Sequence, residues 1–212
     1  MTGIGFIETA GGTFLPYLTY NAQSGDMSVG TSVKEDNGEW RKEKKYITFP
    51  VKFIFDFSSL EKGWMKFESK MPPVFHAMVP VKQPMAAQPP EKNELGKYSF
   101  SQGFRLRLYS SVYGLIDFCQ SSATVRAAMN NLYLVWDKDR GAHPGKEAVV
   151  EIRGTNRVTG KDGKVYKEPD WAITGWVPRP KEMDATPAPA PEPPPVAAIP
   201  ANADFGGDDI PF

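Results

Sequence analysis

Residues 46–57 read YITFPVKFIFDF, and the alternation in the second half of this segment is the strongest indication of the fold class. Large apolar side chains occupy every second position there: Val51, Phe53, Phe55 and Phe57. A period of two is that of a β-strand with one buried face, so the segment predicts a strand. Pro50 has no amide hydrogen to donate to a neighbouring strand, which indicates a bulge or a sheet edge where the strand begins.

Four further segments alternate in the same way and are predicted as strands: residues 64–68, 104–109, 150–153 and 171–177. In the first of them, Trp64 and Lys66 share one face, and Met65 and Phe67 share the other. Residues 161–164 read KDGK, an Asp–Gly turn between polar strands, which predicts a β-hairpin.

The segment 104–109 divides most clearly into two faces. Its apolar face is Phe104, Leu106 and Leu108, and its opposite face is Arg105, Arg107 and Tyr109. Val150 and Ile152 likewise oppose Glu151 and Arg153. Trp171 and Trp176 have opposite parity, so at least one of them should face inward if that strand is regular.

One helix is predicted over residues 122–131, with a Ser cap at Ser121 or Ser122. Its buried face has helical spacing and consists of Val125, Ala128, Met129 and Leu132. Residues 112–119 fit a strand or a helix equally well, and residues 132–136 are predicted to return to a strand.

Several strands with one interposed helix predict a mainly β fold, an OB-fold-like β-barrel with one helix and extended loops. A different β-barrel or a sandwich is the alternative. Six prolines lie between residues 71 and 97: Pro72, Pro73, Pro80, Pro84, Pro89 and Pro90. Most of this stretch is therefore predicted to leave the sheet, as a long loop over the binding surface or over a partner subunit.

Composition excludes several classes of protein. The chain has 212 residues, of which 41% are hydrophobic, enough to bury a core. It contains no run of 18 apolar residues that would predict a membrane span, and its start lacks the pattern of a secretory signal. The single Cys119 fits a reducing compartment, so a cytoplasmic location is expected, in a bacterial cell or in the host of a phage. With only two histidines, a zinc cluster is not expected.

The net charge of zero hides an asymmetry that divides the chain. Five of the 25 acidic side chains, but none of the 25 basic ones, follow Met183. Residues 1–183 therefore carry a charge of +5, and we call them the body. Residues 184–203 contain seven Pro and seven Ala and are predicted to be a disordered, extended linker, with a strap along the body as the alternative. A basic body and an acidic end suggest two different partners.

The last nine residues, 204–212, read DFGGDDIPF and form what we call the tip. Apolar residues at a mobile end are a liability unless a partner receives them. Phe212 also carries the terminal carboxylate, which a basic side chain can bind while the ring enters an apolar pocket. The residues predicted to bind a protein partner are Asp204, Phe205, Asp208, Asp209, Ile210, Pro211 and Phe212.

The tip resembles the acidic C-terminal tip of bacterial single-stranded DNA-binding proteins. In that family an OB-fold body precedes a Pro/Gly-rich linker, and the tip binds enzymes of replication, recombination and repair. The close match covers only the tip, and the body departs from the family in length and in its opening strand pattern. The resemblance implies an OB-fold-like body over residues 1–183 that coats single-stranded DNA. A phage-encoded protein that recruits host enzymes fits this pattern, and a homo-oligomer remains open.

A single strand of DNA offers phosphates and exposed base faces, so its binding surface should combine basic side chains with aromatic platforms. Three regions of the body have this mixture: the run from Glu39 to Tyr46, the polar faces of two predicted strands, and the predicted hairpin. The residues predicted to bind single-stranded DNA are Trp40, Arg41, Lys44, Lys45, Trp64, Lys66, Arg105, Arg107, Tyr109, Arg153, Arg157 and Lys164. Each has a plainer alternative, as a core residue or as part of a solvated face.

No enzymatic activity and no cofactor are predicted. The phosphate-binding Gly-x-x-x-x-Gly-Lys-Ser/Thr loop and the Gly-x-Ser-x-Gly motif are both absent from the sequence. Two other functions stay open. One is an adaptor whose body binds protein and not DNA. The other is a nuclease holding Mg²⁺ on the carboxylates Asp137, Asp139, Glu147 and Glu151.

Overall fold

Nine strands and one long helix make up the part of the chain that this computed structural model describes, which is residues 15–34, 40–67, 73–160 and 162–184. The strands are β1 (Tyr17–Tyr20), β2 (Met27–Lys34), β3 (Trp40–Tyr46), β4 (Val51–Lys66), β5 (Val74–Pro80), β6 (Ser101–Ser110), β7 (Gly114–Gln120), β8 (Lys146–Thr159) and β9 (Val165–Pro178). The helix is α1 (Ala123–Asp139), and two short 3₁₀ turns are η1 (Arg140–Ala142) and η2 (Lys181–Asp184). The mainly β class with one helix is confirmed.

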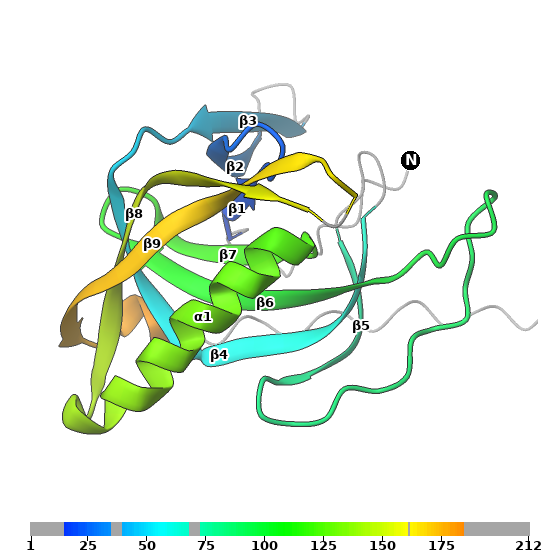
Figure 1. The fold of residues 1–212 in the computed structure, drawn as a ribbon. Helices are drawn as coiled ribbons and strands as arrows, with labels where there is room; N and C mark the ends of the chain where they lie inside the picture. The colour runs from blue at the N-terminus through cyan, green and yellow to red at the C-terminus, as the bar shows by residue number, and fades with distance from the viewer. Residues whose placement is uncertain (1–14, 35–39, 68–72, 161, 185–212) are drawn as a thin grey trace, which may run out of the picture.

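All nine strands belong to one sheet that curls into a half-barrel (Figure 1). Its order is β3-β2-β1-β7-β6-β4-β8-β9, with β5 added to the far half of β4. The β1–β7 pair is parallel, and the other strand pairs described are antiparallel. The curl brings β9 to the end of β1, where the Lys167 N–H donates to the Ala22 carbonyl at 2.7 Å.

The long strand β4 is the backbone of this curl. The sequence predicts two separate strands, at residues 51–57 and 64–68, and this division is wrong because one 16-residue strand covers both. A register shift between Asp56 and Glu61 lets β4 bend without ending. The strand can therefore pair with β8 along its first half and with β5 along its second half.

Most of the predicted excursion over residues 71–97 lies outside the sheet, since residues 81–97 leave it, whereas residues 74–80 form β5 and pair with β4. Pro73 and Pro80 flank or end this edge strand, where a missing N–H costs no ladder hydrogen bond. The chain leaves the sheet only from Val81 to Phe100, between β5 and β6. Trp64 anchors this segment, since its Nε1–H donates to the Ala86 carbonyl at 2.9 Å.

Helix α1 begins after Ser122 as predicted but extends to Asp139, so the predicted strand at 132–136 is wrong. Tyr133 and Trp136 continue the buried face at helical spacing, and their rings pack on Phe57. Residues 112–119 resolve into a turn followed by β7. The predicted hairpin of β8 and β9 is confirmed, and Gly163 in its turn has a φ of +74°.

The two Trp residues of β9 do not have opposite orientations as their parity predicts. Val150 pairs with Ile173 and Val149 pairs with Gly175, which leaves Thr174 as an extra residue in the strand. Such a bulge reverses the alternation, so Trp171 and Trp176 both pack against the core.

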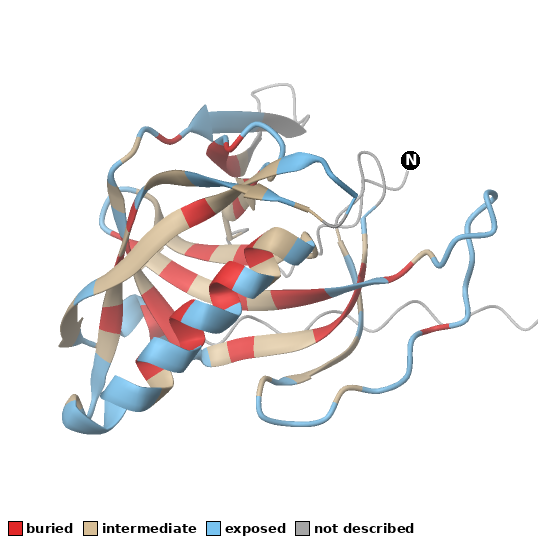
Figure 2. Ribbon diagram, viewed as in Figure 1, coloured by how far each residue is buried: buried red, intermediate tan, exposed pale blue. Residues whose placement is uncertain are grey.

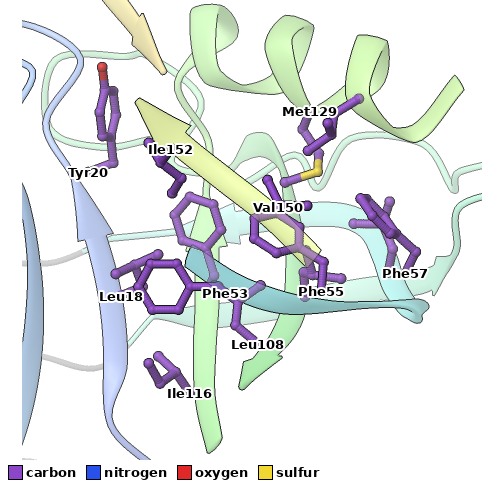
Figure 3. Packing of buried hydrophobic residues seen from close by; sticks show 14 of the residues in the cluster. Leu18, Tyr20, Phe53, Phe55, Phe57, Leu108, Ile116, Met129, Val150 and Ile152 are labelled. Atoms are coloured by element: carbon purple, nitrogen blue, oxygen red, sulfur yellow. The ribbon is translucent and has the colours of Figure 1, made fainter. Parts of the chain in front are cut away.

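The core lies between the sheet and α1, which crosses it (Figure 1). Red, buried positions alternate along the strands and follow one side of the helix (Figure 2). Phe53, Phe55 and Phe57 enter the same cluster as Met129 of α1 and Val150 of β8 (Figure 3). Burial of each such side chain contributes about 1.5–3 kcal/mol, so the alternation that predicts the strands also supplies most of their stability.

The described chain ends at Asp184, just after the fully buried Met183 of η2. The rest of the predicted linker and the whole tip lie outside the described residues. No helix in the part of the chain that the structure describes is long and apolar enough to cross a membrane.

Candidate nucleic-acid interface

One row of paired residues crosses six strands on the side of the sheet that faces away from the core. The row, which we call the outer row, consists of Lys44, Gly30, Tyr17, Asp117, Arg107 and Asp56. The next residues along β1, β7 and β6 are buried in the core: Leu18, Phe118 and Leu106. Adjacent strands are about 4.8 Å apart, so Lys44 and Arg107 are separated by roughly 19 Å along the sheet.

Tyr17 lies directly over Gly30. A Cβ atom added to Gly30 would come within 2.3 Å of the Tyr17 ring, so only glycine allows this placement. On the next strand, Nζ of Lys44 stands 5.1 Å from the centre of the Tyr46 ring, which is 64% exposed. Tyr17, Lys44 and Tyr46 form what we call the aromatic patch, which has one basic group and two aromatic rings on β1 and β3.

At the other end of the outer row, the predicted faces of β6 are confirmed: Phe104, Leu106 and Leu108 are buried, and Arg105 and Arg107 lie opposite them. Both guanidinium groups are paired. Arg105 donates through Nη2 to Asp117 at 2.5 Å and stands 5.2 Å over the Phe75 ring. Burial alone would lower the pKa of Arg105, but the hydrogen bond and charge of Asp117 outweigh it and raise that pKa.

Arg107 donates to Asp56 at 3.1 Å, and Asp56 is completely buried although it lies on the outer side of β4. Arg179 covers the same carboxylate at 2.9 Å, and Ser58 donates to it as well. Burial raises the pKa of Asp56, but the hydrogen bonds from Arg179 and Ser58 and the charge of Arg107 outweigh burial and hold it below its usual value. The Asp56 carboxylate therefore has a structural role, because it holds the guanidinium groups of Arg107 and Arg179 in place.

Arg179 also binds Glu147 at 2.6 Å and Asp184 at 2.7 Å. These contacts hold η2 against the outer side of the sheet, where a pocket of about 540 Å³ lies. Arg105, Arg107 and Asp184 are among the residues that line the pocket. The last described residue of the chain therefore lies beside the basic end of the outer row.

Trp64 and Lys66 are engaged elsewhere. Trp64 is 8% exposed and covered by the 81–100 segment, unlike the open platform that the alternation predicts. Lys66 pairs with Glu91 of the same segment at 2.6 Å. Both side chains hold the 81–100 segment to β4.

Three predicted residues lie on the β8–β9 hairpin and outside the outer row. Arg153 is exposed and pairs with Glu151 at 3.4 Å, and Arg157 is exposed further along β8. Lys164 is exposed in the turn between the two strands. Tyr109 of β6 donates to Glu182 at 3.5 Å.

Lys44 and Lys45 are adjacent and therefore point to opposite sides of β3. Lys45 stands 5.5 Å over the Tyr113 ring and is not in the outer row. Trp40 and Arg41 begin β3 opposite Lys34 and Val33, and their side chains lie outside the description. The predicted partner-binding residues Asp204, Phe205, Asp208, Asp209, Ile210, Pro211 and Phe212 also lie outside the described residues.

Sequence reasoning missed Tyr17, because its place depends on β1 pairing with β2 and with the distant β7. It also missed Phe75, which lies in a stretch predicted to be mostly loop, and Arg179, which lies between two prolines. A glycine opposite an aromatic residue in the strand register would have been the signal for Tyr17, but the register is not visible in the sequence.

The carboxylates considered for Mg²⁺ are spread over separate ion pairs. Asp137 pairs with Lys82 and Arg140, Glu147 with Arg179, and Glu151 with Lys52. Across the described ranges, no three His, Cys, Asp or Glu side chains are placed to hold a metal ion. Burial raises the pKa of the Cys119 thiol well above its usual value.

Comparison of the chain with family models, curated proteins and solved structures found no match.

Proposed function

We propose that this chain binds single-stranded DNA without sequence specificity, coats it during replication, recombination and repair, and recruits partner enzymes through its tip. The observation that carries the proposal is the outer row, which joins the aromatic patch to Arg105 and Arg107 on one continuous sheet face. The acidic, apolar end of the chain supports the recruiting role.

The chemistry of the outer row suits an unpaired strand. An aromatic ring on a sheet can stack on any base, at about 1–3 kcal/mol per base, because every base has a π face. Lys44 can meet a phosphate beside such a stacked base. Arg105 and Arg107 keep unused N–H groups, although their charges are partly neutralised by Asp117 and Asp56.

The strand order supports an OB-type barrel within the half-barrel. Five strands in the order β7-β6-β4-β8-β9 have their helix between the third and fourth in chain order. OB folds bind oligonucleotides on the face of their second and third strands and on the loops after the first and fourth. In this assignment those strands are β6 and β7, which hold Arg105, Arg107 and Asp117.

The N-terminal strands would then widen that binding face. β1 pairs with β7 and continues the sheet through β2 to β3, so Tyr17 and Lys44 extend the surface beyond the barrel. The loop after the fourth strand is the β8–β9 turn with Lys164. The loop after the first contains β5 and the 81–100 segment.

The test is the binding of fluorescently labelled oligo-dT, followed by anisotropy at two salt concentrations. A label on the DNA reports binding more directly than Trp emission, because four of the five Trp residues are in the core or pack against it: Trp64, Trp136, Trp171 and Trp176. Binding should be tight at low salt and weaken as salt rises. Lys44→Ala should weaken it, whereas the matched Lys45→Ala, on the other side of β3, should not.

No binding of oligo-dT at low salt would exclude the proposal and leave the adaptor function. Equal losses of affinity for Lys44→Ala and Lys45→Ala would exclude the outer row as the site while leaving DNA binding in place. Shortening of the oligonucleotide that depends on a divalent metal would instead indicate a nuclease.

A further inference from the structure

A cleft of about 240 Å³ lies between α1, β4, β6 and the start of the 81–100 segment. Its apolar lining includes Leu60, Phe104, Met129 and Tyr133, all of which are buried. Sites for drug-sized ligands usually have volumes of about 300–1,000 Å³, so this cleft suits one or two side chains of a protein partner.

Arg126 of α1 brings a positive charge into this cleft. Arg126 is half-buried, and it donates to the Ser121 carbonyl at 3.2 Å and to the Gln102 side chain at 2.8 Å. Within the described ranges no carboxylate pairs with it, and burial lowers its pKa. Glu61 and Lys62 also line the cleft, and their opposite charges largely offset each other.

The free donors of Arg126 define what the cleft can bind. A guanidinium group has five N–H donors in a planar fork, and Arg126 uses two of its nitrogens. The remaining donors fit a carboxylate, which would also compensate the half-buried charge. Apolar walls with one such cation therefore suit an apolar side chain that lies next to a carboxylate.

Residues 91–98, the outer part of the 81–100 segment, form what we call the arm. All of them are exposed, and the segment projects from the body between β5 and β6 (Figure 1). Leu95 is 80% exposed, more than any other large apolar side chain that the structure describes. The neighbouring Glu94 carboxylate pairs with no basic group of the described residues. The arm therefore presents an apolar group and a carboxylate on adjacent residues.

Hydrogen bonds hold the end of the arm in one conformation. The Gly96 N–H donates to the Asn93 carbonyl at 2.9 Å and closes a β-turn, and Oδ1 of Asn93 accepts from the Leu95 N–H at 3.0 Å. Glu94 and Leu95 occupy the two central positions of this turn. At the base of the arm, the Glu91 carboxylate pairs with a lysine of β4 at 2.6 Å. A preformed turn loses little conformational freedom when it binds a partner.

We propose that the arm of one copy of this chain binds in the cleft of a second copy, with Leu95 among the apolar side chains and the Glu94 carboxylate on Arg126. Neither Glu94 nor Leu95 lines the cleft of its own chain, so the cleft is open to a second copy. The arm and the cleft are different surfaces. Each copy therefore offers one of each, and the contact joins copies in a reciprocal pair or in a row.

The contact is small, so the association is weak in solution. Interfaces that bury less than about 1,200 Å² in total are typical of transient complexes. Copies on one strand of DNA are held at a high local concentration, where a weak contact between neighbours is enough to favour continuous coating. That consequence rests on the proposed function, whereas the association itself needs no DNA.

The test is sedimentation equilibrium of the full chain without DNA, from about 10 μM to about 1 mM. The apparent mass should rise with concentration. Leu95→Ser and Glu94→Arg should each weaken the association at least about tenfold, because each removes one half of the contact. Leu134→Ser is the matched control: Leu134 is 58% exposed on α1 and does not line the cleft, so this variant should associate normally.

An exchange of charges tests the pairing of Glu94 with Arg126 directly. Arg126→Glu should also lose the association, because two carboxylates then meet. An equimolar mixture of the Glu94→Arg and Arg126→Glu chains should associate again, since every arm then meets a cleft of opposite charge. The arm is exposed, so its variants keep the fold and decide the question even where Arg126→Glu unfolds.

A single species of monomer mass up to the highest concentration would overturn the proposal. Association that persists in Leu95→Ser, or a mixture of two folded charge variants that stays monomeric, would overturn it as well. Loss of oligo-dT binding in Leu95→Ser with unchanged association would place the arm on DNA and also overturn it. Oligo-dT binding of the native chain reports on the proposed function independently.

Discussion

At the scale of single residues, Asp56 shows how a charge on the outer side of a strand becomes buried. Phe55 and Phe57 point into the core, so Asp56 must point outward, yet Arg107 and Arg179 cover it completely. A buried carboxylate is stable only when it is paired and hydrogen-bonded, and here two guanidinium groups and Ser58 provide that. Asp56 therefore links β4, β6 and the end of the body.

We expect Asp56→Asn to destabilise the fold at neutral pH by roughly 1.5–3 kcal/mol, the worth of charged hydrogen bonds. The folded state lowers the pKa of Asp56, so its contribution is fully present above the unfolded pKa of about 4 and is lost progressively as the pH falls from there through the lower folded pKa. Denaturant unfolding of both proteins at pH 7 and pH 3 should show the difference shrinking in acid.

The control for this prediction is Asp137→Asn, which removes a more exposed partner of Lys82 and Arg140. Exposed pairs contribute about 0–1 kcal/mol, so its effect should be small. A stability difference between Asp56→Asn and the native chain that is the same at both pH values would contradict the anchoring role.

Gly30 offers a second test at the same scale. A Cβ at this position would clash with the Tyr17 ring, which can swing away at small cost in stability because it is the end of a flexible side chain. Gly30→Ala should therefore weaken oligo-dT binding by about 1–3 kcal/mol, the worth of one stacked base. Gly154→Ala, at a glycine with open space around its Cβ position, is the matched control and should bind normally.

Anisotropy titrations of the two alanine variants, with thermal unfolding to confirm the fold, decide this point. Normal DNA binding by Gly30→Ala would remove Tyr17 from the site.

At the scale of elements, β6 matters most, because its two faces have different tasks. Leu106 and Leu108 build the core, and Arg105 and Arg107 pair with carboxylates of β7 and β4. These pairs lock the β6 side chains in place, which favours a preformed surface over a flexible one. The cost is that part of their charge is already compensated before DNA arrives.

Replacing Arg105 and Arg107 by alanine should weaken oligo-dT binding and flatten its dependence on salt, by about 0.7 in the logarithmic slope for each phosphate that the variant no longer binds. The measurement is the dissociation constant between low and moderate salt. Lys82→Ala, an exposed lysine paired with Asp137, serves as the control. Affinity that is unchanged at low salt would remove both arginines from the site.

At the scale of the whole molecule, the body and the tip are proposed to have separate tasks. Deletion of residues 204–212 should spare oligo-dT binding or tighten it slightly, since it removes negative charge that competes with phosphates. The same deletion should abolish the capture of replication and repair enzymes in a pull-down with the full chain as the comparison. A strong loss of DNA affinity in the deletion variant would contradict this division.

Local pattern in the sequence is sufficient to predict four of the nine described strands, β4, β6, β8 and β9, and most of their buried faces. Burial on one side of a strand has a period of two whatever strand lies beside it, so Phe53, Phe55, Leu106 and Val150 could be assigned to the core. The errors arose where local pattern and tertiary context diverge. The second half of α1 contains β-branched and aromatic residues, yet it stays helical because Tyr133 and Trp136 pack on Phe57.

Which charged and aromatic side chains share a surface depends on the tertiary structure alone. Tyr17 meets Asp117 because β1 lies beside β7, and Arg179 meets Asp56 across 123 residues of chain. Trp64 and Lys66 read as exposed in the sequence, but the 81–100 segment covers the ring and binds the amine. Pairing between distant strands depends on the packing of the whole sheet, and no local pattern of residues carries that information.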